Sequence, residues 1–468
     1  MLTEAQTTQT FGQTSAAVQS VVAYLKSSGF SNVVASSDAL TVTATGTVAQ
    51  AESAFKTKID SVKIGSVGTF VNVVPAYVPS ALGGLVTAVE GLSGATMHSD
   101  LRAYGTTATC TQVPAIGTCV SGSLSAAGLR SFYDVGKVPT ASKTTLATIA
   151  AGSLVGFAAD VQSGEAAAGI KSVPVTIVPV GVASKDASAL PEWDTDAETA
   201  LGVAGGASRF YVYDTTSLGE ADVTAALERF ESDDVARAAS ISFGICEDVA
   251  QTDGSMLVDD TLLALAALHG QTLFAATGDL LDGCPAQQYP ASSPYAVAVG
   301  GTTVLLTPNG PPAGEVAWPI TDGGASLFET APFWQSGITP ASAGKLRAVP
   351  DLVLDGDPNS GALVVTHGTQ TPVGGTSVSA PLALGLWGRL ESAHGNALGF
   401  AATRLYHEYA DLRTSADATP PTGALQQTIG GFNDLLLGTN GLPATPEFDF
   451  ATGLGSLNET LQSADITR

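Results

Sequence analysis

The stretch TLFAATGD, residues 272–279, indicates the fold class, because an apolar run suited to a buried strand ends at a glycine and an acid. A helical pattern precedes it at 259–268, and another strand pattern follows at 295–299. The alternation continues upstream, with strand patterns at 173–180, 209–213 and 239–243 and helical patterns at 197–204 and 222–229. It predicts a doubly wound, mostly parallel α/β sheet. Sites in such sheets form outside the carboxyl ends of strands, so Asp279 is a candidate site residue, unless it only caps a turn.

The first 95 residues predict a separate α+β unit. Helical patterns cover 15–28 and 48–59, and strand patterns cover 39–45 and 68–78. This mixture suits an antiparallel sheet with helices on one face. Residues 96–127 are rich in Gly, Ser and Thr, which is typical of an exposed linker that proteases reach.

The composition limits the partners and the medium. The 468 residues include 43 acidic and 19 basic residues, give a net charge of −24, and are only 13% charged. Nucleic acids and anionic membranes need basic patches, so neither is expected as a partner. No apolar run reaches the roughly 18 residues of a membrane span. A fold with few ion pairs loses little stability when carboxylates protonate, which suits an acidic medium.

The cysteines favour export. There are four, and an even count in a Lys-poor chain favours disulfides. The simplest of the three possible connectivities pairs Cys110 with Cys119 and Cys246 with Cys284. The sequence opens at MLTEAQ without a basic and apolar leader. We therefore expect a secreted, extracellular protein whose signal peptide is absent from this sequence.

A serine follows two glycines in GGTSVSAP, residues 374–381, and an apolar run over 382–390 comes next. This order places the Ser377 hydroxyl at a helix N-terminus, where backbone N–H groups can hold an oxyanion. A Gly-rich turn capped by Ser or Thr has the same local pattern. The pattern alone does not decide between a nucleophile and a cap.

A nucleophilic serine needs a base. His367 lies only ten residues before Ser377, so a Ser-His-Asp triad is the weaker interpretation. Glu192 and Asp196 are four residues apart and share one face of a helix. Two like charges at that spacing raise one pKa, although acids are also common in the first turn of a solvated helix.

Taken together and in order, these motifs resemble the sedolisin, or serine-carboxyl peptidase, family over essentially the whole chain. The matching segments are Glu192–Glu198, Ser240–Glu247, Ala275–Asp279, Tyr289–Thr302, Arg347–Asp351 and Gly375–Pro381. The resemblance implies a subtilisin-like catalytic domain at 128–468. It also implies that residues 1–95 are a ferredoxin-like propeptide and that the linker at 96–127 contains the processing site.

The resemblance also implies the roles of the site residues. Ser377 would be the nucleophile, Glu192 its general base, and Asp196 the residue that orients Glu192. Asp279 would stay protonated and donate a hydrogen bond to the oxyanion, which requires a pH near carboxyl pKa values. Substrate-binding positions would be Ser242, Gly244 and Gly324.

One structural calcium ion is a further implication of the resemblance. The C-terminal stretch is similar to the family's calcium loop, in which two carboxylates and backbone carbonyls form a hard-oxygen cage. The positions carried over are Asp434, Leu435, Thr445, Glu447 and Asp449. The family tends to have glycines where Thr445 and Glu447 stand.

We therefore expect a secreted, acid-acting serine-carboxyl endopeptidase, made as an autoprocessed zymogen and inhibited by its own propeptide. Its partners would be protein or peptide substrates, with no nucleic acid and no membrane, and the chain would be a monomer. The first alternative is a catalytically silent sedolisin-like binding or scaffold protein, which is expected to lack one of the four site residues. The second is a neutral subtilisin-type hydrolase, which requires a catalytic histidine.

Overall fold

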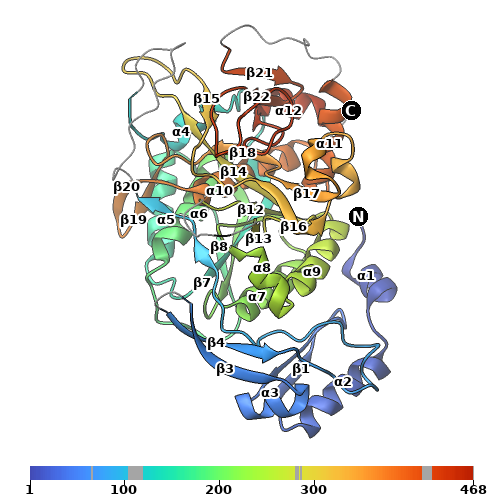
Figure 1. The fold of residues 1–468 in the computed structure, drawn as a ribbon. Coiled ribbons are helices and arrows are strands. Elements are labelled where there is room, and N and C mark those ends of the chain that lie inside the picture. The colour runs from blue at the N-terminus through green and yellow to red at the C-terminus, as the bar shows by residue number, and fades with distance from the viewer. Residues whose placement is uncertain (65–66, 104–119, 280–283, 285–286, 414–423, 467–468) are drawn as a thin grey trace.

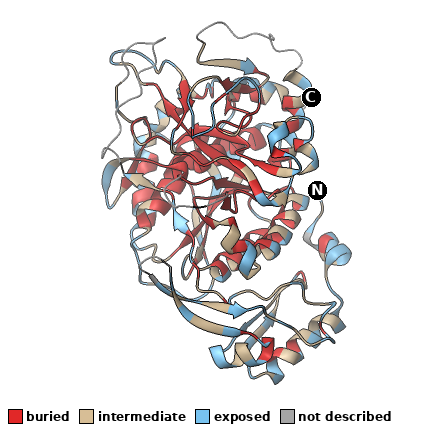
Figure 2. Cartoon of the chain, viewed as in Figure 1, coloured by how far each residue is buried: buried red, intermediate tan, exposed pale blue. Residues whose placement is uncertain are grey.

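The structure is a computed structural model that describes residues 1–468 except 65–66, 104–119, 280–283, 285–286, 414–423 and 467–468. A small N-terminal unit lies against one side of a much larger α/β unit (Figure 1). The buried residues concentrate in the middle of the large unit, around its sheet and the helices that cover it (Figure 2).

The N-terminal unit is built from helices and short antiparallel hairpins. β1 pairs with β2, and β3 pairs with β4, in both cases antiparallel. A small apolar core that includes Leu25, Phe55 and Leu92 holds the unit together. Its elements are α1 (Glu4–Phe11), α2 (Ser15–Ser27), β1 (Ser31–Ala35), β2 (Val42–Thr45), α3 (Val48–Phe55), β3 (Lys58–Ile64) and β4 (Val67–Val74).

Several details of this unit differ from the sequence prediction, which did not include strands β1 and β3. The predicted helix at 48–59 ends at Phe55, because Lys56 takes a left-handed conformation with φ of 50° and strand β3 begins at Lys58. Helix α1 was not predicted. It begins at a capping box in which the side chains of Thr3 and Gln6 bond each other's backbone N–H.

The large unit contains the predicted mostly parallel sheet. Its eight strands run in the order β15-β14-β12-β10-β7-β9-β8, with β18 also paired to β14. Every pairing is parallel except that of β14 with β15. The strands are β7 (Ala141–Ala151), β8 (Val175–Pro179), β9 (Ala207–Thr215), β10 (Ala238–Ile241), β12 (Thr272–Ala276), β14 (Val297–Val304), β15 (Glu315–Ala317) and β18 (Leu352–Asp355).

The five predicted strands of this sheet are all present within a few residues, but β15, β18 and the central strand β7 were missed. β7 lies in the middle of the sheet, and eight of its eleven residues are buried without the alternation of a one-sided strand. Its residues are mainly Ala and Thr, so it also lacks the large apolar side chains that mark a core strand.

Helices enclose the sheet. α10 packs on α6 and on the central strands β7, β10, β12 and β14, and it is buried from Thr376 to Ser392. α7 and α9 pack together next to β9 and β12. The helices of this unit are α4 (Ala126–Phe132), α5 (Phe157–Ala168), α6 (Leu190–Ala204), α7 (Glu220–Asp233), α8 (Glu247–Asp253), α9 (Ser255–His269), α10 (Thr376–Ala393), α11 (Ala401–Leu412) and α12 (Glu459–Asp465).

The remaining strands lie outside the main sheet and form small two- and three-stranded sheets. They are β5 (His98–Ser99), β6 (Arg102–Ala103), β11 (Phe243–Cys246), β13 (Gln288–Tyr289), β16 (Gly324–Thr330), β17 (Leu346–Val349), β19 (Ala362–Thr366), β20 (Thr369–Gly374), β21 (Gln426–Ile429), β22 (Phe432–Leu435) and β23 (Ser456–Leu457). Among the helices that the structure describes, none is both long and apolar enough to cross a bilayer.

A buried ion pair connects β17 to the main sheet. Both guanidinium NH2 groups of Arg347 donate to Asp351, at 2.8 and 2.5 Å, and both side chains are almost fully buried. Asp351 also accepts the backbone N–H of Ala298 on β14 at 2.7 Å. The Arg347–Asp351 motif therefore has a structural role, in which two strands share one satisfied carboxylate.

One of the two expected disulfides is present. Cys246, at the end of β11, is bonded to Cys284, as the spacing suggested. The other expected pair, Cys110 and Cys119, lies outside the described residues.

The expectation of a wholly exposed linker is wrong for residues 98–103. Asp100 has no exposed surface, and the segment is held between two strands of the large unit. β5 pairs antiparallel with β11, and β6 pairs antiparallel with β20. Backbone hydrogen bonding to two edge strands therefore overrides the loop-like composition of this segment.

The buried carboxyl groups predict a fold that is most stable in acid. Burial raises the pKa of Asp194, Glu315 and Glu391 to about 7 and that of Glu459 to about 8. A carboxyl whose pKa is raised by folding stabilises the native state fully below its unfolded pKa of about 4, and this contribution is lost as the pH rises through the folded pKa. The thermal unfolding midpoint of the chain should fall between pH 5 and pH 8. Glu459→Gln should reduce that fall, and a midpoint that rises over this range would contradict the prediction.

Candidate active site

Helix α6 carries Glu192 and Asp196 on one buried face. Both side chains have almost no exposed surface. The indole N–H of Trp193, also fully buried, donates to the backbone carbonyl of Ala151 at 2.7 Å and holds the helix against the end of β7. The alternative that Glu192 and Asp196 are merely solvent-exposed acids in the first turn of a helix is therefore excluded.

Two hydroxyl groups hold Asp196. Thr148 on β7 donates to one carboxylate oxygen at 2.8 Å, and Ser242 donates to the other at 2.5 Å. Burial raises the pKa of Asp196 to about 7, and these two hydrogen bonds oppose the rise. Asp196 is thus fixed by the sheet and not by a hydrogen bond to Glu192.

Glu192 lies between Asp196 and the serine. Burial first, and then the charge of Asp196, raise the pKa of Glu192 well above its usual value. The Ser99 hydroxyl donates to Glu192, and this hydrogen bond and the nearby Ser377 hydroxyl oppose the rise. A carboxyl that is hard to ionise and lies near the Ser377 hydroxyl has the position expected of a base.

Ser377 is the second residue of α10, as the glycine-serine pattern predicted. Its hydroxyl donates to the backbone carbonyl of Ser242 at 3.0 Å. Gly375, directly before the helix, has φ of 100°, a conformation that glycine adopts without strain. A side chain at Gly375 would also collide with the Asp100 carbonyl oxygen, which lies 1.9 Å from the ideal Cβ position. Glycine is therefore required at 375 while the linker is bound.

Asp279 follows β12 and faces the start of α10. One carboxylate oxygen accepts both the backbone N–H and the hydroxyl of Thr376, each at 3.0 Å. The other accepts the guanidinium Nε of Arg102 from the linker at 2.8 Å. Burial raises the pKa of Asp279 to about 6, and the hydrogen bonds and the Arg102 charge oppose the rise.

The fold thus brings the four predicted catalytic positions, Ser377, Glu192, Asp196 and Asp279, into one buried cluster. Ser242 directly follows β10 and Asp279 lies three residues after the end of β12, at the carboxyl ends where sites of parallel sheets form. The arrangement offers a hydroxyl nucleophile, an adjacent carboxyl base, and a second carboxyl at the N-terminus of the helix that bears the serine.

The predicted substrate-binding positions divide into two groups. Ser242 and Gly244 hold the linker: the Ser242 carbonyl accepts the Asp100 N–H at 3.3 Å, and Gly244 pairs with His98. Gly324 begins β16 and lies beside Gln287, where a Cβ atom would be 2.8 Å from the side-chain nitrogen. Its backbone pairs with Val349 and not with the linker.

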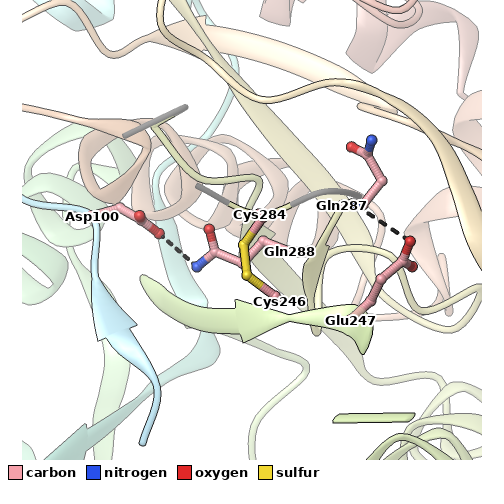
Figure 3. Close-up of a disulfide and its surroundings, with 6 residues drawn as sticks. All are labelled: Asp100, Cys246, Glu247, Cys284, Gln287 and Gln288. Carbon is pink, nitrogen blue, oxygen red and sulfur yellow. Dashed lines mark hydrogen bonds between the residues drawn. A yellow bond between two sulfur atoms is a disulfide. The ribbon is translucent and has the colours of Figure 1, made fainter. Parts of the chain in front are cut away.

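Sequence reasoning missed several residues of this site. Ser99 and Arg102 lie in the segment interpreted as an exposed linker, and only the tertiary structure places them against Glu192 and Asp279. Gln288 was also missed, although it directly precedes the Tyr289–Thr302 motif. Its side-chain N–H donates to Asp100 at 3.0 Å, next to the Cys246–Cys284 disulfide (Figure 3).

None of the five histidines, all within the described residues, is hydrogen-bonded to Ser377. His367 takes a left-handed conformation between β19 and β20, and its backbone N–H donates to Asp160. The ring of His269 lies next to Thr7 and Glu231, and that of His394 next to Ser463. The geometry gives the triad alternative no histidine base.

The predicted calcium residues also lie together. The backbone N–H of Glu447 donates to Asp434 at 2.8 Å, and that of Thr445 donates to Asp449 at 2.6 Å. Glu447 has φ of 65°, so this position keeps a glycine-like backbone conformation without being glycine. Leu435 is the last residue of β22, directly after Asp434.

Comparison with known proteins agrees with this geometry. The family model described as "Pro-kumamolisin, activation domain" matches residues 1–95, and the "Subtilase family" model matches residues 163–427. Sedolisin from Pseudomonas sp. (strain 101) is 32% identical over 97% of this chain and 80% of its own length. Xanthomonalisin from Xanthomonas sp. (strain T-22) is 32% identical over 98% of this chain, which spans 60% of that protein.

A solved structure is similar as well. The structure described as Pseudomonas sedolisin, a serine-carboxyl proteinase, in complex with pseudo-iodotyrostatin has a TM-score of 0.65 and 31% identity, covering 75% of this chain and 99% of that one. Fold and site together define a serine-type peptidase with a subtilisin-like catalytic domain and an N-terminal activation domain. Within that class, the chain belongs to the sedolisin family of serine-carboxyl peptidases.

The ion pair between Arg102 and Asp279 predicts how the linker affects the site. Arg102→Gln removes a charge and a hydrogen bond that lower the Asp279 pKa, so Asp279 should remain protonated to a higher pH. Self-cleavage of the full chain, followed by mass spectrometry, should then begin at a higher pH than in the wild type. Arg229→Gln removes an exposed charge on α7 and serves as the control. An onset that stays in place or moves to lower pH would contradict the predicted effect.

Proposed function

We propose that this chain is the zymogen of an acid-acting endopeptidase in which Ser377 is the nucleophile and Glu192 the general base. One observation carries the proposal: Ser377 lies near the buried Glu192 and directly follows Thr376, which bonds the buried Asp279, and the pKa values of both carboxyls are raised above those of exposed carboxyls. The site contains no group better placed than Glu192 to accept the serine proton among the described residues.

The chemistry follows from the two carboxyl groups. Ser377 Oγ attacks the carbonyl carbon of the peptide bond while its proton passes to Glu192. Protonated Asp279 and the backbone N–H of Ser377 donate to the oxyanion. The C–N bond then breaks, Glu192 returns the proton to the leaving amine, and an acyl-enzyme remains on Ser377. Water releases the acid by the same steps, with Glu192 again acting as base.

This mechanism requires acid. Asp279 can donate to the oxyanion only while protonated, and its pKa of about 6 places that form below pH 6. Glu192 must be ionised in the same pH range. Asp196 lies next to Glu192 on α6 and is not hydrogen-bonded to it. Because the three carboxyls interact, they titrate as one system, and activity should follow the titration of the cluster.

We also propose that residues 1–95 act as an intramolecular inhibitor and that the chain processes itself. The linker occupies the position of a substrate strand and contacts both Glu192 and Asp279, so it blocks access by other peptides. We propose further that the propeptide ends at residue 95 and that the catalytic domain begins after residue 127. The protein would be a secreted monomer that acts on protein substrates.

A pH shift of the full chain tests this function. On transfer from pH 7 to pH 4, the wild type should lose its N-terminal unit and gain activity on a protein substrate, while Ser377→Ala stays whole. Glu192→Gln should slow the reaction by about 10² to 10⁴-fold, the usual contribution of a general base.

Matched controls lie in the same helices. Ser379→Ala removes a buried hydroxyl of α10 that bonds the Leu354 carbonyl, and Glu198→Gln neutralises a buried acid of α6 that accepts the Val365 N–H. Both should leave proteolysis largely unchanged if they fold. A wild-type chain that stays whole and inert at pH 4 would support the silent scaffold instead.

We further propose that the C-terminal loop holds one structural Ca²⁺ through Asp434, Asp449 and backbone carbonyls near Leu435, Thr445 and Glu447. Asp434 Oδ1 is buried and has no hydrogen-bond partner among the described residues, which leaves a hard oxygen ligand available. The nearby charges of Asp449 and Glu447 repel that of Asp434, and a cation would relieve this repulsion. Bound calcium would stabilise the loop.

Chelation tests the calcium proposal without an activity assay. EDTA should lower the thermal unfolding midpoint of Ser377→Ala by several degrees, and excess Ca²⁺ should restore it by mass action. Asp434→Asn should abolish this response, whereas Asp411→Asn, at an exposed acid of α11, should not. A midpoint that is insensitive to both EDTA and calcium would rule out the ion.

A further inference from the structure

We propose that the first bond cleaved by this enzyme is Asp100–Leu101, and that Gln288 makes the site select residues whose side chains accept a hydrogen bond on the acyl side of that bond. The inference rests on the proposed function, since it assigns a substrate class to the same site. It follows from how residues 98–103 lie across the cluster of Ser377, Glu192 and Asp279.

The residues before the proposed bond bind as an added strand. β5 extends the sheet of β13 and β11, with Ser99 paired to Phe243 and His98 paired to Gly244. The Asp100 N–H donates to the carbonyl of Ser242, the same oxygen that accepts the Ser377 hydroxyl. The Asp100 backbone is therefore held directly beside the nucleophile by a contact that does not depend on its side chain.

The residues after the proposed bond bind to a different strand. Arg102 pairs with Gly374 and Ala103 with Val373 on β20, the strand that leads into Gly375 and α10. The chain thus leaves one edge strand at Asp100 and joins another at Arg102, so the Asp100–Leu101 bond spans the gap between them.

Three contacts centre the catalytic groups on this bond. The Asp100 carbonyl oxygen lies against Gly375, two residues before Ser377. On the acyl side, the Ser99 hydroxyl donates to Glu192 and accepts the Leu101 N–H at 3.2 Å, which connects the base to the nitrogen that would leave. On the amine side, Arg102 reaches Asp279.

The Asp100 side chain points toward the side-chain amide of Gln288. The Gln288 side-chain N–H donates to Asp100 Oδ2 at 3.0 Å, and Gln288 is 2% exposed, so this donor is shielded from water (Figure 3). A pocket that contains a buried donor disfavours an apolar residue of the same size, because the donor would lose its partner. Asp and Asn fit this requirement, and Leu does not.

The surroundings fix the Gln288 amide in place. Cβ atoms at Gly244 and Gly278 would lie 2.4 Å from its nitrogen and 2.1 Å from its oxygen, so glycines on both sides leave room for the amide. Its backbone pairs with Cys246, which is bonded to Cys284. Gln288 is thus a rigid specificity residue that lies apart from the groups that transfer protons.

The proposed cleavage follows the mechanism already given. Ser377 Oγ forms a bond to the Asp100 carbonyl carbon, and its proton passes to Glu192. The Asp100–Leu101 C–N bond breaks, and the same proton completes the new amine of Leu101. Water then hydrolyses the ester between Ser377 and the main-chain carbonyl of Asp100, which leaves a free α-carboxyl group on Asp100. The products are a propeptide that ends at Asp100 and an enzyme that begins at Leu101 before any further trimming.

The first experiment identifies the earliest cut. The full chain is shifted from pH 7 to pH 4 and sampled at short times, and intact and terminal masses are measured. We expect an initial fragment that ends at Asp100. Processing that begins at another bond would overturn this inference while leaving the proposed function in place. A chain that stays whole and inert would overturn both.

The second experiment measures selectivity in trans. Three peptides have the sequence of residues 96–103, with Asp, Asn or Leu at position 100. Their kcat/KM is measured with the enzyme that the full chain releases at pH 4. Asn and Leu are similar in size and neither titrates, so their ratio reports the hydrogen bond. We expect roughly a tenfold or greater preference for Asn. A ratio near one would overturn the assignment of Gln288.

Gln288→Met is the matched variant, because it keeps the length of the side chain and removes the donor. It should abolish the Asn preference while retaining activity on the Leu peptide. Unchanged selectivity in Gln288→Met would contradict the role of Gln288. If this variant fails to fold, Asp100→Asn and Asp100→Leu in the full chain take its place: Asn should be processed at the same bond, and Leu should slow that cut about tenfold. Equal rates would again overturn the inference.

Discussion

The burial of three carboxyl groups around one serine hydroxyl is the constraint on which the site depends. Glu192, Asp196 and Asp279 are almost fully removed from water, and desolvation is the first cause of the raised pKa of each. Their neighbours are mostly hydroxyl and backbone N–H donors from the sheet and from α10, which partly offset that cost. The three carboxyls therefore do not all ionise at neutral pH. Because they interact, they retain and share protons as the pH falls into the acid range.

The linker adds the one positive charge that reaches this cluster in the described structure. Arg102 pairs with Asp279, and Ser99 bonds Glu192, so the linker contacts the proposed base and the proposed oxyanion carboxyl at once. In the proposed mechanism, departure of this segment removes both partners and leaves the carboxyls easier to protonate. Inhibition and activation would then depend on the same few contacts, since the inhibitor lies where a substrate must lie.

The fold could be predicted well from the sequence where local pattern and burial agree. The strand at β12, the helices α2, α6 and α9, and the position of Ser377 at the start of α10 all follow from periodicity and glycine placement. The missed central strand β7 is buried without alternation and consists of small residues, so it has no period to detect. Helix α3 ends earlier than predicted because Lys56 takes a left-handed conformation, which the hydrophobic periodicity does not indicate.

The site shows the same division. The sequence by itself determined which residues can act at the site, namely Glu192, Asp196, Asp279 and Ser377. Each of them lies in a short contiguous motif whose chemistry can be recognised without the fold. Only the tertiary structure decided that Ser99, Asp100 and Arg102 lie across them and that Gln288 faces Asp100, because these contacts join segments more than ninety residues apart. Edge-strand pairing of the linker depends on backbone groups that every residue carries, so the composition of residues 96–127 gave no sign of it.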